Sequence, residues 1–198
     1  TFRYPTEFTT LLYASQMLQA EAIKYGVEHF RRNRGRCMGA IYWQLNDCWP
    51  VASWASVDYE GRWKALHYYA KRFFAPVMVS CEEQNWMTAE ANMNREHFVY
   101  EKSIRLNVTN ETLEDKKVLV KWALRNADAS VVKAEEREVT VPALSSVWLD
   151  KEEYPDVDVF GQYVSYEAWE GDTCISEGSV IFSYPKYFHY LDPQLSYR

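Results

Sequence analysis

The hydrophobic pattern of the chain changes its period near Pro76, and this change most limits the folds available to it. Before Pro76, apolar residues recur every three to four positions, which predicts helices over residues 7–33 and 61–76. After Pro76, apolar and polar residues alternate in short runs between turn residues, which predicts strands. The charge balance changes at the same place, because ten basic and six acidic residues precede it while 12 basic and 22 acidic residues follow. The sequence therefore predicts a domain boundary near Pro76.

A helix, a strand and a second helix are predicted within residues 1–76. The first helix, over residues 7–33, has Thr6 as a candidate cap and Gly35 after its end. Apolar or small residues cover more than half of its circumference, so it requires neighbours on two sides. The run RCMGAIYWQL over residues 36–45 is apolar without alternation, which is typical of a strand buried on both faces in a parallel sheet. Such a strand needs neighbouring strands that residues 1–76 do not supply.

About seven short strands are predicted after Pro76, and they suggest an antiparallel sandwich of immunoglobulin-like size over residues 77–183. Pro142 and Pro155 fall at breaks or strand ends, where a missing N–H does least harm. Strand alternation puts Trp122 in phase with Val118 and Val120, and therefore in the core. The predicted strands cover residues 76–83, 97–101 (weakly), 102–110, 116–126, 137–150, 161–171 and 177–185. The predicted fold class is therefore α+β.

Three of the eight tryptophans fall within residues 37–54, beside amide and carboxylate side chains. A tryptophan at the carboxyl end of a buried parallel strand faces the rim where barrel enzymes form their active sites. An indole packs on the apolar face of a sugar, while amides and carboxylates bind its hydroxyls. This pattern predicts a sugar-binding site made of Trp43, Asn46, Asp47 and Trp49. Two alternatives stay open: the indoles only cover the core, and Asp47 only holds N–H groups of its loop.

Residues 38–77, MGAIYWQLNDCWPVASWASVDYEGRWKALHYYAKRFFAPV, resemble the closing strand and helix of the catalytic barrel in the β-mannosidase branch of glycoside hydrolase family 2. The preceding LLYASQMLQAEAIKYGVEHFRR is similar to the helix before the last barrel strand of that family. The resemblance implies that residues 1–76 are the C-terminal portion of a (β/α)8 barrel, with the immunoglobulin-like domain over 77–183. Residues 184–198 look like a linker towards a further β-domain.

The activity that this resemblance implies is that of a retaining exo-glycosidase, which removes terminal β-linked mannose from β-mannoside oligosaccharides. The family carries its two catalytic carboxylates on earlier barrel strands, upstream of Thr1, so no residue here is expected to be catalytic. The chain alone is therefore expected to be inactive. Trp43 corresponds to the indole that forms the floor of the sugar site, which in related barrels often precedes a non-proline cis peptide bond. No cofactor is implied.

Two other functions remain open from the sequence. One is another activity of family 2, that of a β-galactosidase or a β-glucuronidase. The other is a non-catalytic sandwich module, either structural or carbohydrate-binding, for which Trp122, Trp148 and Trp169 are candidate sugar contacts.

Several classes of partner and site are disfavoured by composition. The acidic second half argues against duplex nucleic acid, which requires a basic face. No apolar run approaches the ~20 residues that span a bilayer. The four cysteines lack the spacing of a metal site. We expect a cytoplasmic protein. The broad apolar surface of residues 1–76 predicts that the isolated chain forms homo-oligomers, makes swapped contacts or has a disordered amino-terminal part.

Charged residues near the predicted helix ends are expected to stabilise the turns and helix ends in which they lie. Asp58 is interpreted as an acceptor in a turn or at a helix start, and Glu60 as a first-turn charge that complements the helix dipole. A cluster of basic residues is interpreted as the end of the first helix, where cations complement free carbonyls. These residues are Arg31, Arg32, Arg34 and Arg36.

Overall fold

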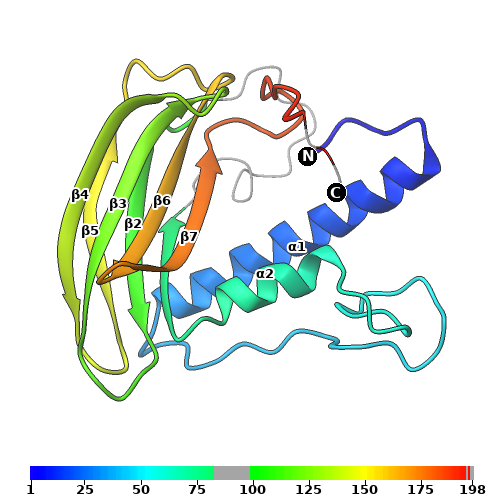
Figure 1. Cartoon of the computed structure of the whole chain (residues 1–198), viewed down its shortest axis with the longest axis horizontal. Helices are drawn as coiled ribbons and strands as arrows, with labels where there is room; N and C mark the ends of the chain where they lie inside the picture. The colour runs from blue at the N-terminus through cyan, green and yellow to red at the C-terminus, as the bar shows by residue number, and fades with distance from the viewer. Residues whose placement is uncertain (83–98, 195, 197–198) are drawn as a thin grey trace.

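Two helices lie beside a sandwich of two β-sheets in the computed structural model, which describes residues 1–82, 99–194 and 196 (Figure 1). The elements are α1 (Phe8–Arg32), α2 (Ala65–Phe73), β1 (Val77–Glu82), β2 (Ser103–Asn110), β3 (Lys116–Asn126), β4 (Val131–Val141), β5 (Ser145–Glu153), β6 (Gln162–Glu170) and β7 (Thr173–Ile181). Within this described part, no helix is both long and apolar enough to cross a bilayer.

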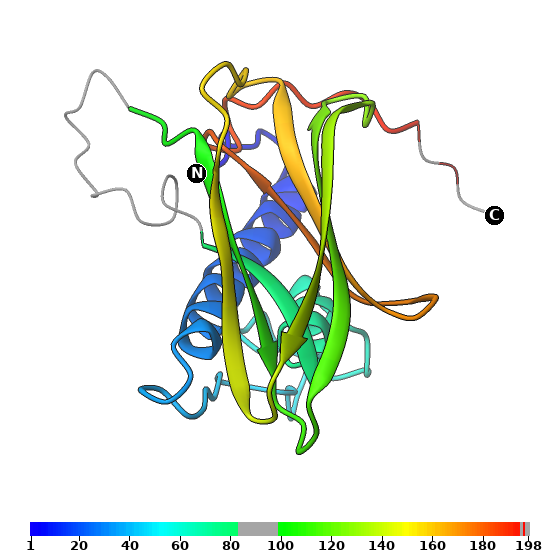
Figure 2. The same cartoon turned by 90° about the vertical axis from the view of Figure 1, so that its left-hand side faces the viewer.

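The predicted antiparallel sandwich is confirmed. One sheet has the strand order β1-β2-β5 and the other β4-β3-β6-β7, and every pairing is antiparallel. Figure 2 shows the two sheets facing each other, and the residues between them form the larger core. On β3 the side chains of Val118, Val120 and Trp122 are buried in this core, as their alternation predicts.

Three strand predictions need correction. The run predicted over 137–150 forms two strands, because Pro142 cannot donate to a ladder and Leu144 adopts a positive φ of 51° in the turn. The last strand begins at Thr173, four residues earlier than predicted, because Gly171 (φ +57°) allows a tight hairpin between β6 and β7. The weak strand over 97–101 lies partly outside the described residues, and its described part, 99–101, is not a strand.

The long first helix is confirmed, although its predicted cap is wrong. Glu7 occupies the N-cap position of α1 without a side-chain capping hydrogen bond, and Gly35 (φ +97°) follows the end of the helix. The second helix is shorter than the predicted 61–76, because a turn at Gly61 (φ +82°) precedes α2. A small second core joins α1, α2 and β1 through Ala20, Val27, Leu66, Phe73 and Met78.

The strand predicted over 36–45 is wrong. This segment carries no ladder, and only two isolated bridges, Asn46–Val57 and Val57–Trp63, follow it in the described connection. Ile41 is fully exposed, whereas a strand of a parallel sheet would bury it. The described part of the chain provides no neighbouring parallel strand for its N–H and C=O groups, so the sheet that the prediction required does not form. The described order is therefore helix, extended segment, helix.

The basic cluster lies at the end of α1, as predicted, and two of its members, Arg31 and Arg32, also form an interface. Arg31 is buried and donates to the carbonyls of Phe73 and Ala75 over 2.6 and 2.8 Å. Arg32 donates to the carbonyl of Cys81 on β1 over 3.0 Å. These contacts connect the helices to the first strand of the sandwich.

Candidate sugar-binding site

The candidate site lies on the long connection between α1 and α2, which projects beyond the helices on the side away from the sandwich (Figure 1). Four indoles are exposed on this connection, and Trp43 is the most exposed of them, at 74%. The other three are Trp49, Trp54 and Trp63. Exposed indoles in one segment provide flat apolar surfaces of the kind that sugars bind.

Trp43 and its neighbour Tyr42 lie in different environments. The Tyr42 ring packs against Phe73 and Phe74, with ring centroids 6.4 and 6.2 Å apart, whereas the Trp43 side chain is exposed. The peptide bond between Trp43 and Gln44 is cis, as the family resemblance implies. The indole is therefore displayed on a segment whose other face is anchored to α2.

Asp47 lies beneath this surface. It is only 6% exposed, and its carboxylate accepts a hydrogen bond from Ser53 Oγ (2.5 Å) and pairs with Lys64 Nζ (3.3 Å). Ser53 Oγ in turn accepts the N–H of Ala55 at 3.0 Å. This geometry favours the alternative in which Asp47 holds its loop. The carboxylate does so through the side chains of Ser53 and Lys64 and not through N–H groups of the main chain.

Asn46 and Trp49 are both exposed, so three of the four predicted site residues are at the surface. The side-chain amide of Asn46 donates to the carbonyl of Asp47 over 3.1 Å, and that of Gln44 donates to the carbonyl of Asn46 over 2.8 Å. These local hydrogen bonds order the polar side chains that follow Trp43.

Sequence reasoning missed two residues of this region, Ser56 and His67. Ser56 is completely buried, and its Oγ lies 3.0 Å from Tyr42 Oη and 3.1 Å from His67 Nδ1. His67 follows Trp63 by four residues, and their rings are in edge contact at 4.4 Å. That spacing was a signal for a contact, but no local pattern indicated Ser56.

Asp58 acts as the predicted turn acceptor. Its carboxylate accepts the N–H groups of Glu60 and Arg62, both at 2.9 Å, and the Arg62 side chain at 2.6 Å. These hydrogen bonds, those from Arg62 first, lower the pKa of Asp58. The first-turn role predicted for Glu60 is wrong, because α2 begins only at Ala65, and Glu60 instead pairs with Arg62 at 3.3 Å.

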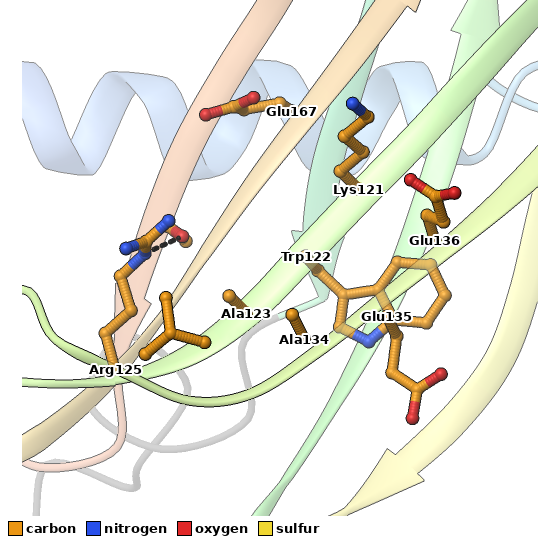
Figure 3. Close-up of a pocket in the computed structure, with 10 residues that line it drawn as sticks. Lys121, Trp122, Ala123, Arg125, Ala134, Glu135, Glu136 and Glu167 are labelled. Carbon is orange, nitrogen blue, oxygen red and sulfur yellow. Dashed lines mark hydrogen bonds between the residues drawn. The ribbon is translucent and has the colours of Figure 1, made fainter.

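A second concave surface lies on the outer face of the four-stranded sheet. It is a groove of about 470 Å³ across β4, β3 and β6, with Lys121, Arg125, Glu136 and Glu167 among its lining residues (Figure 3). Arg125 donates to Ser165 Oγ over 2.8 Å, the dashed line in Figure 3. The groove is lined by both signs of charge.

The three sandwich tryptophans present no open indole face of the kind seen at Trp43. Trp122 packs in the core. The guanidinium of Arg105 lies over the Trp148 ring at 4.6 Å, and Lys121 Nζ lies over the Trp169 ring at 5.3 Å. A cation thus covers one face of each of these two rings.

No group of three or more His, Cys, Asp or Glu side chains that could hold a metal ion occurs in the described ranges. All four cysteines are free thiols. The groups that the α1–α2 connection exposes to a ligand include indoles and side-chain amides.

Comparison with known proteins gives consistent matches. Residues 102–187 match the family model of the Mannosidase Ig/CBM-like domain. The β-mannosidase of Capra hircus is 49% identical over 78 residues, which cover 36% of this chain and 9% of that protein. The β-mannosidase of Mus musculus is 41% identical over 100 residues, which cover 46% of this chain and 11% of that protein. The chain thus spans about a tenth of the length of these relatives.

A solved structure extends the similarity to nearly the whole chain. The β-D-mannosidase of Dictyoglomus thermophilum superposes with a TM-score of 0.80 at 27% identity. The superposition covers 96% of this chain and 22% of that one, so it includes both the helical part and the sandwich.

Proposed function

The chain belongs to the β-mannosidase branch of glycoside hydrolase family 2, and we propose that it forms the C-terminal part of a retaining exo-β-mannosidase. The superposition over 96% of the chain on a β-D-mannosidase is the observation that carries this proposal. Residues 1–76 then complete a (β/α)8 barrel, residues 77–183 form the immunoglobulin-like domain, and residues 184–198 lead towards a further β-domain.

The proposed role of this chain in hydrolysis is to bind the sugar. A retaining glycosidase needs two carboxyl groups ~5 Å apart, one as nucleophile and one as acid and base. Asp47 is buried and paired with Lys64, and Asp58 is engaged by Arg62, so neither is proposed to react. Trp43 forms the floor beneath the mannose ring, Asn46 and Trp49 contact its periphery, and Asp47 supports their loop.

Kinetics of the full-length protein that contains this chain test the proposal. We expect hydrolysis of 4-nitrophenyl β-D-mannopyranoside and a loss of kcat/KM of about a hundredfold or more in Trp43→Ala. Trp169→Ala on the sandwich is the matched control and is expected to retain wild-type kinetics. Hydrolysis of the corresponding β-galactoside or β-glucuronide instead would overturn the substrate assignment. Mannoside hydrolysis by the 198-residue chain alone would overturn the assignment of its role.

A carbohydrate-binding role for the sandwich is the second candidate, favoured by the groove across β4, β3 and β6. Calorimetric titration of the chain with mannose oligosaccharides tests it. Saturable binding that survives Trp43→Ala but is lost in Glu167→Gln would support this role. Equal binding heats for the wild type and Glu167→Gln would exclude a binding role for the sandwich.

A further inference from the structure

We propose that Ser56 and His67 are positioning residues that fix the segment carrying the Trp43 indole. The positioning role is argued from contacts in the structure and does not depend on the proposed function. Only its consequence for catalysis rests on the proposed function, in which that indole is the floor of the sugar site.

Ser56 binds the main chain directly after Trp43. It is completely buried, its N–H donates to the carbonyl of Gln44 over 3.0 Å, and its Oγ–H donates to the carbonyl of Leu45 over 2.9 Å. Both donors of one residue are thus used on two consecutive carbonyls. This arrangement fixes the direction of the chain immediately after the exposed indole.

The remaining contacts of Ser56 Oγ determine the protonation of its neighbours. A hydroxyl has one proton and two acceptor lone pairs, and the proton is already directed to Leu45. Tyr42 Oη at 3.0 Å and His67 Nδ1 at 3.1 Å must therefore both donate to Oγ. This requirement assigns a proton to Nδ1 of His67 and fully satisfies the buried hydroxyl.

Ser56 consequently holds residues on both sides of Trp43, namely Tyr42 before it and Gln44 and Leu45 after it. His67 connects this group to a rigid element, because it lies in the first turns of α2. Its ring is held in turn by the edge contact with Trp63 at 4.4 Å. A hydrogen-bonded path therefore runs from α2 through Ser56 to the main chain that carries the Trp43 indole.

A pair of substitutions at one position separates this role from a general contribution to packing. His67→Ala removes the donor, whereas His67→Asn places an amide N–H at the same distance from Cβ as Nδ1; both remove the ring contact with Trp63. Lys71→Ala, at an exposed position of the same helix, is the control. Indole ¹H–¹⁵N NMR spectra of the 198-residue chain, with the Trp43 signal assigned from Trp43→Phe, provide the readout.

We expect the Trp43 signal to shift in His67→Ala, to return to its wild-type position in His67→Asn, and to be unchanged in Lys71→Ala. An unchanged signal in His67→Ala, or equal shifts in both His67 variants, would overturn the proposal. If His67→Ala does not fold, Ser56→Ala replaces it. The proposal is then supported if the Trp43 signal shifts in Ser56→Ala and keeps its wild-type position in His67→Asn. An unshifted Trp43 signal in Ser56→Ala overturns it.

Kinetics of the full-length protein then test the consequence for catalysis. With 4-nitrophenyl β-D-mannopyranoside we expect kcat/KM to fall roughly tenfold in His67→Ala and to recover to within about twofold in His67→Asn. A wild-type protein without mannosidase activity would contradict the proposed function, while the NMR comparison would still decide the positioning role. An active protein in which the wild type, His67→Ala and His67→Asn have equal kinetics would overturn the catalytic consequence.

Discussion

The guanidinium of Arg31, at the end of α1, donates to the carbonyl of Phe73 over 2.6 Å across 42 residues of sequence. Because Phe73 is the last residue of α2 and β1 begins at Val77, this bond fixes the place where the helical part meets the sandwich. The same guanidinium reaches Ala75 at 2.8 Å and lies 3.7 Å from Glu111. A buried cation bound to carbonyls thus holds the two parts in one orientation.

Arg31→Met keeps much of the side-chain volume but removes both hydrogen bonds, leaving two carbonyls without their donor. We expect the free energy of unfolding to fall by about 2–4 kcal/mol. Arg31→Lys supplies one ammonium that cannot bridge both carbonyls, so it is expected to lose about half as much. Arg36→Ala, at an exposed position, is the control and should stay within about 0.5 kcal/mol. Equal urea midpoints for Arg31→Met and Arg36→Ala would contradict this account.

Removal of the Asp47 side chain is expected to lower the free energy of unfolding, because Lys64 loses its partner. Asp47→Ala leaves the largely buried ammonium of Lys64 without its carboxylate, which should cost about 2–3 kcal/mol of unfolding free energy. The double variant with Lys64→Met leaves neither charge, so its cost should be smaller than the sum of the single variants by about 1 kcal/mol or more. Urea denaturation of the four proteins measures this coupling. Strictly additive losses would show that the pair does not interact.

Alkaline pH should destabilise the protein through Tyr154. Burial, and secondarily the nearby carboxylate of Glu152, raises the pKa of Tyr154 to about 12. The unfolded chain loses the phenol proton near pH 10, so between about pH 10 and 12 the folded state binds more protons and stability falls as pH rises. We expect Tyr154 to contribute a loss of about 1–2 kcal/mol across this range, and Tyr154→Phe removes this contribution but not that of Tyr69, whose pKa burial also raises. Tyr4→Phe, at an exposed position, should keep the wild-type pH dependence of unfolding.

The sandwich could be predicted because the alternation of residues along each strand shows which face is buried. Along β3, Val118, Val120 and Trp122 recur at every second position and so share one face of the strand, and the structure buries these three. The strand boundaries were less accurate where backbone conformation decides them. A positive φ at Leu144 and at Gly171 sets the turns, and hydrophobic periodicity does not report it.

The helical part was predicted less well, because its environment comes from distant residues. The apolar run over 36–45 suggested a buried strand, but a strand requires partners that an apolar pattern cannot supply. The role of Arg31 depends on carbonyls 42 and 44 residues away, so its sequence neighbourhood suggested only a helix end. Trp43 is exposed, and its role in a sugar-binding surface stays a prediction. The support given by Ser56 and His67 depends on tertiary contacts, which no local sequence pattern reports.

Asn110 provides the sharpest test of a polar residue within the sandwich. It is completely buried at the end of β2, and its amide nitrogen donates to the carbonyls of Glu114 (2.8 Å), Val141 (3.1 Å) and Pro142 (3.1 Å). Its carbonyl oxygen accepts both the N–H and the hydroxyl of Thr112. One side chain therefore joins the turn after β2 to the end of β4.

Replacement of Asn110 by Asp separates the two halves of this amide. A carboxylate still accepts from Thr112 but cannot donate, and it places negative charge against carbonyl oxygens, so Asn110→Asp is expected to lose about 3 kcal/mol or more of unfolding free energy. The loss should shrink as the pH falls and the carboxyl gains a proton, because a protonated carboxyl can donate once. Thermal unfolding between pH 4 and 8 measures both effects against wild type. A variant with wild-type stability at pH 8 would show that these carbonyls do not depend on Asn110.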